Sequence, residues 1–522
     1  MSDYTTQDLE DNLNYLAETK RQIKEAIKDK GVTILDEDTF RSYVDKIDDI
    51  PSLNWGYLGF TDTPKTIKDS YNYSKQLVDN EETIPLSKNG TTYPIAQYYP
   101  DLEYLPKLSV IRTSLNNTFA NLQVLKEMAL IDTSSVTTMN STFLQCYELT
   151  TIPLLDTSNV TNLENAFQSC RKLNNLPLID TSSVTNMRYT FQGCTSLTTI
   201  PLLDTSSVTN MYRAFYQCTS LTSIPLIDVS NVTTMEQTFY GCSNLTSIAN
   251  LNMAKVTNVS NMFNNCSSLT TVPNFSFPLL SSTAYMFQNC TSLESVPLFD
   301  MSNITNTSNM FTNCSKLTTL PLFDLSSVTS TASMFYQCYI LETVPAWNLE
   351  SCGSSANMFQ NCNALKSVPD FNFLVNQNLR YMFYGCKNLT TVPDWNLPNG
   401  RVLEYMFTNC IALVSAPNFN IGNLQTMQNM FQGCTALENV PVYDTSNAYD
   451  SSVLMAFRYA FKDCPNLTDT SLNNIMEMCI NATRYTGTKT LNHLGLTSEQ
   501  ATRCESLSNY QDFIDAGWSK GY

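Results

Sequence analysis

The chain has 522 residues, with 30 basic and 47 acidic side chains and a net charge of −17, so it offers no basic footprint for the phosphates of nucleic acid. Hydrophobic residues make up 43% of the sequence, which is enough to build a core and excludes a globally disordered chain. The sequence has a single histidine, His493, which argues against nucleophilic catalysis that depends on histidine and against zinc sites with histidine ligands.

Residues 1–52 are predicted to form a small helical module for attachment or oligomerisation. Apolar residues alternate at spacings of four and three, which places them on one face of a helix: Leu9, Leu13, Leu16, Ile23 and Ile27. This face would pair with a second copy of the chain or pack on a second helix of the module. That second helix is expected to begin at Asp38 and to stop before Pro51.

Residues 53–112 differ from the regular repeat that follows and are expected to form a linker and an N-terminal cap. The start of the chain lacks the basic and apolar regions of a secretion signal, and no window approaches about 18 consecutive apolar residues. We therefore expect neither a cleaved signal nor insertion into a membrane.

From residue 113 to about residue 470, one pattern recurs every 24 residues. Apart from Cys352, the cysteines from Cys146 to Cys434 are separated by that interval, with Phe three residues before each of them and Leu three residues after. A period of roughly 20 to 29 residues with Leu-x-x-Ile spacing predicts a leucine-rich-repeat solenoid. The expected fold class is therefore an α/β repeat of about fifteen 24-residue coils with a parallel sheet, preceded by the helical module and closed by a helical C-terminal cap.

Each coil is predicted to hold one short strand and one short helical turn. The strand should lie near a Leu-Thr-Ser-Ile-Pro segment such as Leu221–Pro225, where the proline ends the ladder. The segment from Met to Cys has a spacing close to 3.6 and predicts the turn. Gly or Asn precedes most of the cysteines, as in Gly193 and Asn265, and can end the turn in the left-handed conformation.

Of the 17 cysteines, those of the regular column are predicted to be reduced, and Cys352, Cys479 and Cys504 lie outside it without metal-ligand spacing. Equivalent residues of adjacent coils stack in parallel, whereas a disulfide needs Cβ vectors that point toward each other. Buried free thiols behave as small hydrophobic groups, so the cysteine column should be part of the core.

A column of aspartates follows the predicted strand, and asparagine replaces it in other coils. Carboxylates in a row could bind calcium, but an Asx turn explains both residue types, because asparagine keeps the hydrogen bond without the charge. We favour the turn and expect no metal and no cofactor. The aspartates are Asp156, Asp180, Asp204, Asp228, Asp300, Asp324 and Asp444.

A second column, nine residues after each cysteine, changes from aliphatic to aromatic at Phe275. Eight aromatic side chains in register could form a platform on which sugars stack. Side chains in neighbouring columns change size at the same boundary. The residue before the Phe of each coil changes from Thr or Ala to the larger Met, and such coordinated changes are what close packing requires. We therefore favour a place in the core for the aromatic side chains.

The candidate recognition surface consists of columns in which the residue type varies from coil to coil without a matching change of side-chain size in neighbouring columns. Tyrosines and amides on a rigid frame suit adaptable recognition. The tyrosines lie two residues before a cysteine, and the other candidates follow the strand proline, or Ala249 in the coil where alanine replaces it. The candidates are Tyr216, Tyr240, Tyr336, Tyr384, Asn250, Asn274, Asp370 and Asp394.

Residues 471–522 are predicted to form the C-terminal cap, because the last coil of a solenoid would otherwise expose its apolar face. Helical stretches are expected from Ser471 to Cys479 and near Thr497.

The repeat core x-x-Phe-x-x-Cys-x-x-Leu-x-x-Ile-Pro, followed by Asp-x-Ser-x-Val-Thr-x-Met, resembles the BspA-like leucine-rich repeats of bacterial surface proteins. The segments Glu18-Thr-Lys-Arg-Gln-Ile-Lys and Thr39-Phe-Arg-Ser-Tyr-Val, and the ending Ala516-Gly-Trp-Ser-Lys-Gly-Tyr, are similar to tail- or fibre-type virion proteins of tailed bacteriophages. The first resemblance implies extracellular recognition and adhesion. The second implies attachment to a virion and release by lysis.

The first functional hypothesis is a bacteriophage virion structural protein, without enzymatic activity, that displays its repeats for recognition of the host cell. Its partners would be other virion proteins, bound through residues 1–52, and a host surface protein or polysaccharide, with a homo-oligomer possible. A bacterial cell-surface adhesin is the alternative. A glycan-active enzyme is a second alternative, although no carboxylate pair stands out from its column.

Overall fold

A computed structural model describes residues 113–128, 131–177, 179–449 and 456–522. It also describes the short strands β1 (Ser87–Lys88), β2 (Thr91–Thr92) and β3 (Tyr104–Leu105), of which β1 and β2 pair antiparallel. The predictions for residues 1–52, including the apolar seam from Leu9 to Ile27, lie outside the described residues. Among the helices in the described part of the chain, none is long and apolar enough to cross a membrane.

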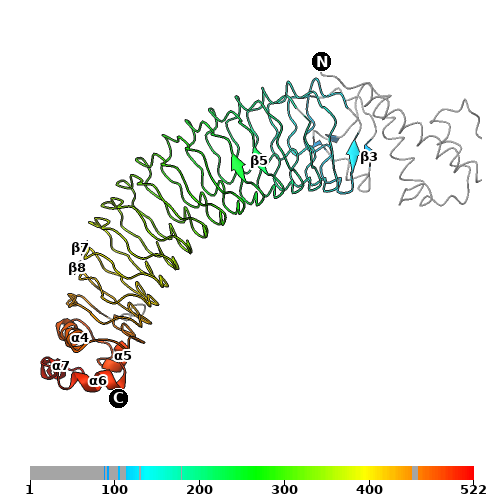
Figure 1. The fold of residues 1–522 in the computed structure, drawn as a ribbon. Helices are drawn as coiled ribbons and strands as arrows, with labels where there is room; N and C mark the ends of the chain where they lie inside the picture. The colour runs from blue at the N-terminus through cyan, green and yellow to red at the C-terminus, as the bar shows by residue number, and fades with distance from the viewer. Residues whose placement is uncertain are drawn as a thin grey trace, which may run out of the picture.

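The predicted repeat solenoid of the leucine-rich-repeat type is confirmed, with the 24-residue units stacked as coils along a curved arc (Figure 1). Conserved Phe, Cys and Leu side chains form continuous buried ladders from coil to coil. Neighbouring phenylalanine rings stack with centroids 5.3 Å apart at Phe119 and Phe143, and 5.7 Å apart at Phe335 and Phe359. The core is therefore one column of apolar side chains along the whole array, because no coil can bury its inner face alone.

All 17 cysteines are free and buried, which confirms the prediction for the cysteine column. Each thiol of the ladder donates to the carbonyl oxygen of a phenylalanine in the preceding coil, as from Cys170 Sγ to Phe143 O at 3.1 Å. Burial raises the pKa of Cys146 to about 12. The ladder thiols thus stay protonated and pack as small hydrophobic groups.

The parallel sheet is less continuous than predicted, because its strands are only two residues long and pair two at a time. Strands of two residues pair in parallel: β3 with β4 (Glu127–Met128), β5 (Ser223–Ile224) with β6 (Ser247–Ile248), and β7 (Asn396–Leu397) with β8 (Asn420–Ile421). Strand β5 occupies the predicted segment. A more continuous ladder of single parallel bridges runs through the residue before Met139, Met187 and the equivalent positions of other coils, where no strand was predicted: Ser114, Thr138, Asn162, Asn186, Asn210, Thr234 and Asn258.

The predicted helical turn between Met and Cys is wrong. In the coil of Cys194, Thr190 N donates to Met187 O at 3.2 Å, and Cys194 N donates to Phe191 O at 3.1 Å, as in β-turns. The N–H groups of Met187 and Phe191 instead donate to carbonyl oxygens of the next coil, at 3.0 and 2.8 Å. The segment is a string of overlapping turns because every second N–H finds its partner in the neighbouring coil rather than in a helix.

The direction of the curve follows from the spacing of equivalent side chains. Ring centroids of Tyr381 and Tyr405 are 4.6 Å apart, whereas those of Phe275 and Phe299, in the aromatic column, are 6.3 Å apart. Coils that lie closer on one side than on the other must bend toward the closer side. The turn segments with the tyrosines therefore form the concave side, and the aromatic column lies toward the convex side.

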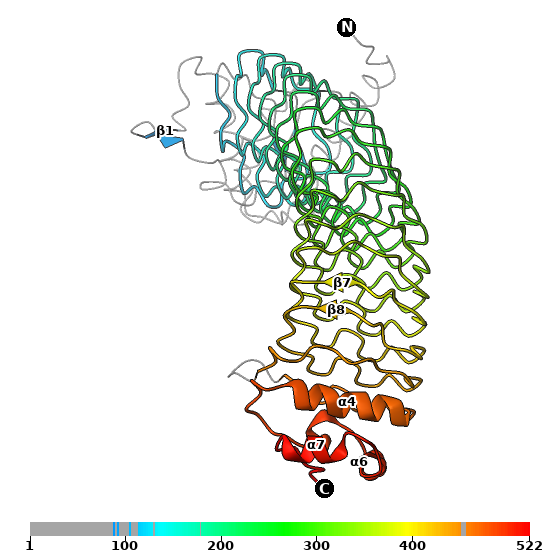
Figure 2. The same cartoon turned by 90° about the vertical axis from the view of Figure 1, so that its left-hand side faces the viewer.

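Four helices follow the last coil: α4 (Asp469–Asn481), α5 (Leu491–Leu494), α6 (Ser498–Cys504) and α7 (Tyr510–Asp515). Helix α4 lies across the end of the coils, with α6 and α7 beyond it (Figure 2). Both helical stretches expected in the tail are present, as α4 and α6.

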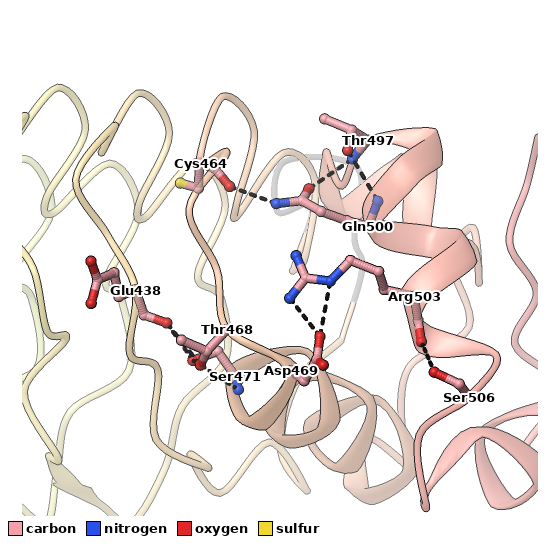
Figure 3. A network of polar contacts seen from close by, with 9 residues as sticks. All are labelled: Glu438, Cys464, Thr468, Asp469, Ser471, Thr497, Gln500, Arg503 and Ser506. Atoms are coloured by element: carbon pink, nitrogen blue, oxygen red, sulfur yellow. Dashed lines mark hydrogen bonds and ion pairs between the residues drawn. The ribbon is translucent and has the colours of Figure 1, made fainter.

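Polar side chains join the helices to the last coils (Figure 3). Thr468 caps α4, and the Ser471 hydroxyl donates to Glu438 O at 2.7 Å. Gln500 completes a capping box with Thr497, and its Nε2 donates to Cys464 O at 2.7 Å. These bonds use carbonyl oxygens that the next coil of the solenoid would otherwise use.

Candidate recognition surface

The candidate residues lie on two different sides of the solenoid. Tyr216, Tyr240, Tyr336 and Tyr384 lie half-buried in the turn segments of the concave side. The candidates beside the strand proline are exposed next to the aromatic column, toward the convex side: Asn250, Asn274, Asp370 and Asp394. The structure therefore divides what the sequence suggested as one surface.

The aromatic column is buried, as favoured above, so the sugar platform is wrong. Phe275, Phe299 and Trp395 are at most 2% exposed. Their rings stack on each other and on the conserved phenylalanines, as Phe275 does on Phe263 with centroids 6.2 Å apart. These rings therefore present no face to a ligand.

The aspartate column forms the predicted Asx turns. Asp180 Oδ1 accepts from the backbone N–H of Ser182 at 2.9 Å and from its hydroxyl at 2.7 Å. These bonds lower the pKa of Asp180, so the carboxylate remains ionised. Where asparagine replaces aspartate, amides link adjacent coils, as from Asn420 Nδ2 to Asn396 Oδ1 at 2.8 Å. The turn thus accounts for the aspartates without an ion, whereas Asn396 Oδ1 accepts a bond from the next coil instead.

One group of aromatic and cationic side chains, the N-terminal tyrosine–arginine cluster, lies on the concave side of three adjacent coils. The guanidinium carbon of Arg213 lies 5.2 Å from the ring centroid of Tyr212 and 4.9 Å from that of Tyr216. Tyr216 stacks on Tyr240 with centroids 4.8 Å apart. The cluster is defined by Arg188, Tyr189, Tyr212, Arg213, Tyr216 and Tyr240.

The C-terminal tyrosine–arginine cluster consists of Arg380, Tyr381, Tyr384, Glu404 and Tyr405. Tyr381 stacks on Tyr405, meets Tyr384 edge to face at 5.8 Å and lies 5.0 Å from the Arg380 guanidinium carbon. Arg380 Nε lies 3.0 Å from Glu404 Oε2. Burial raises the pKa of Tyr405, so its hydroxyl stays protonated as a donor for a ligand.

Both clusters use a position that the sequence reasoning missed, five residues before the cysteine. Every coil places this residue in the left-handed conformation, because its N–H reaches the next coil between two turn bonds, as from Tyr189 N to Tyr212 O at 2.9 Å. Most coils carry Asn, Ser or Gln there, whereas bulky residues occur at φ near 60° in the others: Tyr189, Arg213, Tyr285, Tyr381, Tyr405 and Tyr459. The recurrent asparagine was the signal that could have identified the position.

The repeat also matches a family model described as "Mycoplasma protein of unknown function, DUF285", in overlapping segments 113–223, 171–276, 198–296, 281–391 and 356–474. The chain belongs to the DUF285 family. The family matches begin at residue 113, so the resemblance of residues 1–52 to virion proteins has no support from them. No curated protein matches the chain.

Several solved structures are similar to this DUF285 chain at low identity. A leucine-rich repeat protein from Bacteroides ovatus is 21% identical, with 66% of this chain and 87% of that chain covered and a TM-score of 0.34. One from Eubacterium ventriosum is 17% identical, with 56% and 92% covered and a TM-score of 0.26. The Drosophila Toll receptor in complex with Spatzle is 14% identical, with 68% and 49% covered and a TM-score of 0.25. At these scores the similarities support no conclusion of their own.

Proposed function

We propose that the chain is a non-enzymatic recognition protein whose solenoid binds a host surface protein or polysaccharide through the two tyrosine–arginine clusters. The observation that carries the proposal is the placement of tyrosine and arginine at left-handed positions where other coils use asparagine. A bulky side chain in that conformation costs about 1–2 kcal/mol. Because this conformational cost recurs in adjacent coils on one face, it favours a functional rather than a structural role for these tyrosines and arginines.

The chemistry of the clusters suits binding. Tyrosine and arginine are enriched at the residues that dominate protein interfaces, and tyrosine gives a large contact area for little side-chain entropy. The stacked rings of Tyr216 and Tyr240, and of Tyr381 and Tyr405, are fixed by the coil spacing before any ligand arrives. Pre-organised rings of this kind lose little conformational freedom on binding.

Attachment to a bacteriophage particle is the second element of the proposal. Its support is the sequence of residues 1–52 and of the ending from Ala516, which resemble virion proteins. Residues 1–52 would bind other virion proteins, and the repeats would be displayed outside the host cell. A bacterial surface adhesin with the same recognition face is the competing proposal.

Binding rather than hydrolysis of glycans is proposed because each aspartate of the repeat column named above belongs to a regular series of turns. Asp204 accepts from Ser206 and Asp300 from Ser302 in the same way. A glycosidase needs two carboxylates in different environments on either side of a bond.

The binding test compares matched asparagine variants of the full chain on host cells. The double variant Tyr381→Asn/Tyr405→Asn should weaken binding at least about tenfold, as expected for the loss of two interface tyrosines. Tyr285→Asn is the control, because Tyr285 has the same left-handed conformation but lies outside both clusters. Equal binding by the double variant, with the control unchanged, would overturn the proposed site.

The location is tested separately with an antibody to the repeats. We expect labelling of purified phage particles in negative stain. Labelling confined to bacterial envelopes would replace the virion proposal with the adhesin.

A further inference from the structure

A row of exposed leucines crosses the coils on the side away from the tyrosine–arginine clusters. These leucines directly follow the strand proline, and the next but one residue is an aspartate. Leu202 and Leu226 are each 66% exposed and Leu322 is 61% exposed, although leucine is normally a core residue. We call this row the leucine–aspartate stripe: Leu154, Leu202, Leu226, Leu298 and Leu322 with Asp156, Asp204, Asp228, Asp300 and Asp324.

The two positions of the stripe vary together along the sequence. Coils with leucine or valine at the first position have aspartate at the second, as in Leu202 and Asp204. Coils with Asn, Asp or Ala at the first position have asparagine or serine at the second, as in Asn250 and Asn252. From the coil of Cys146 onward, aspartate at the second position is therefore restricted to coils with leucine or valine at the first.

Turn formation explains the aspartate, but neither packing nor the turn explains the exposed leucine that accompanies it. The first position points to solvent, so the core does not select leucine there. The second position can make its turn with asparagine as well, since Asn252 Oδ1 accepts from the backbone N–H of Ala254, although Asp204 accepts a further bond from the Ser206 hydroxyl. An exposed leucine that recurs beside an ionised aspartate therefore points to something outside the solenoid that contacts both side chains.

The charge of the stripe is uncompensated. Hydrogen bonds from serine lower the pKa of Asp204, Asp228, Asp300 and Asp324, so these side chains remain carboxylates. Between described residues, no ion pair involves an aspartate of the stripe. The charge of Asp204 offsets part of this lowering of the pKa at its neighbour Asp228, which is repulsion that a cation would relieve.

We propose that the leucine–aspartate stripe is a docking surface for a segment of a partner protein that presents apolar side chains beside a row of lysines or arginines. Such a segment buries the leucines and neutralises the aspartates at the same time. A second copy of this chain does not fit, because two stripes would bring like charges together. The chain would then hold one protein on this side while the clusters on the concave side remain free for another.

The probe for this surface is an amphipathic peptide of leucine and lysine, with a leucine–glutamate peptide of equal length as its control. Fluorescence anisotropy with the full chain should show binding of the lysine peptide alone. The variants Leu202→Asn/Leu226→Asn and Asp204→Asn/Asp228→Asn should each weaken it about tenfold. Both should fold, because asparagine occupies these positions in other coils, as Asn250 and Asn252. Tyr381→Asn/Tyr405→Asn, on the other side, should leave it unchanged.

Three results would overturn the proposal. Weaker binding in the aspartate variant but not in the leucine variant would indicate adventitious attraction of a cationic peptide. Equal binding of the glutamate peptide would remove the charge argument. A dimer in sedimentation that the leucine variant converts to a monomer would make a second copy the occupant.

Discussion

The Arg380 guanidinium lies 3.0 Å from the Glu404 carboxylate, one coil further along, and the Glu404 side chain is only 4% exposed. Thr426 also donates to Glu404 Oε1 at 3.4 Å. This carboxylate is therefore largely taken out of water, and Arg380 is the cation that compensates it. The pair joins two adjacent coils within the C-terminal tyrosine–arginine cluster.

Removal of Arg380 should destabilise the fold. Arg380→Ala leaves the Glu404 carboxylate without its cation, and we expect a loss of about 1–2 kcal/mol, less than for a fully buried pair because Arg380 is half exposed. Thermal unfolding measures the effect. Arg188→Ala is the control, because Arg188 lies 3.6 Å from the more exposed Glu164. A fall in Tm no larger than that of the control would contradict the role of the pair.

Replacement of Tyr285 by asparagine should stabilise the chain. Tyr285 is 39% exposed and has φ of 61°, so the variant relieves strain and exposes little that was buried. We expect a gain of about 1 kcal/mol, measured as a rise in Tm. A lower Tm would mean that the tyrosine makes contacts worth more than the strain.

Acid should weaken the solenoid through the aspartate column. The pKa values of Asp180, Asp204 and Asp228 are lowered by hydrogen bonds from serine. Their contribution is complete above the unfolded-state pKa of about 3.9 and is lost as the pH falls through the lower folded-state values. Tm should therefore fall between pH 5 and pH 3, and by less in Asp204→Asn/Asp228→Asn. Equal falls in both proteins would assign the effect to other groups.

The cysteine ladder should be inert in the native state. Burial raises the pKa of Cys146 and Cys242 to about 12, so almost no thiolate exists at pH 8 and none of it is accessible. Iodoacetamide and mass spectrometry should find the ladder unlabelled in the native chain and labelled after denaturation in guanidinium. Rapid native labelling of Cys290 or Cys314, in the middle of the array, would contradict the packed ladder.

The sequence by itself determined the features that every coil shares. The 24-residue period identified the solenoid, and the columns through Phe143, Cys146 and Leu149 identified its core, since identical residues in register can stack only in a repeating structure. The change from Asp204 to Asn252 in one column identified an Asx turn. These predictions succeeded because they depend on contacts within a coil or between equivalent residues.

Only the tertiary structure decided what depends on the hydrogen bonds and distances between neighbouring coils. The segment from Met187 to Cys194 has a helical spacing, yet its N–H groups reach the next coil, so no helix forms and Tyr189 is forced into the left-handed conformation. The curve that sets the tyrosine–arginine clusters apart from the leucine–aspartate stripe has the same origin. Equivalent rings lie closer together in the turn segments, as at Tyr381 and Tyr405, than in the aromatic column, as at Phe275 and Phe299. This difference arises only when the coils are stacked on one another.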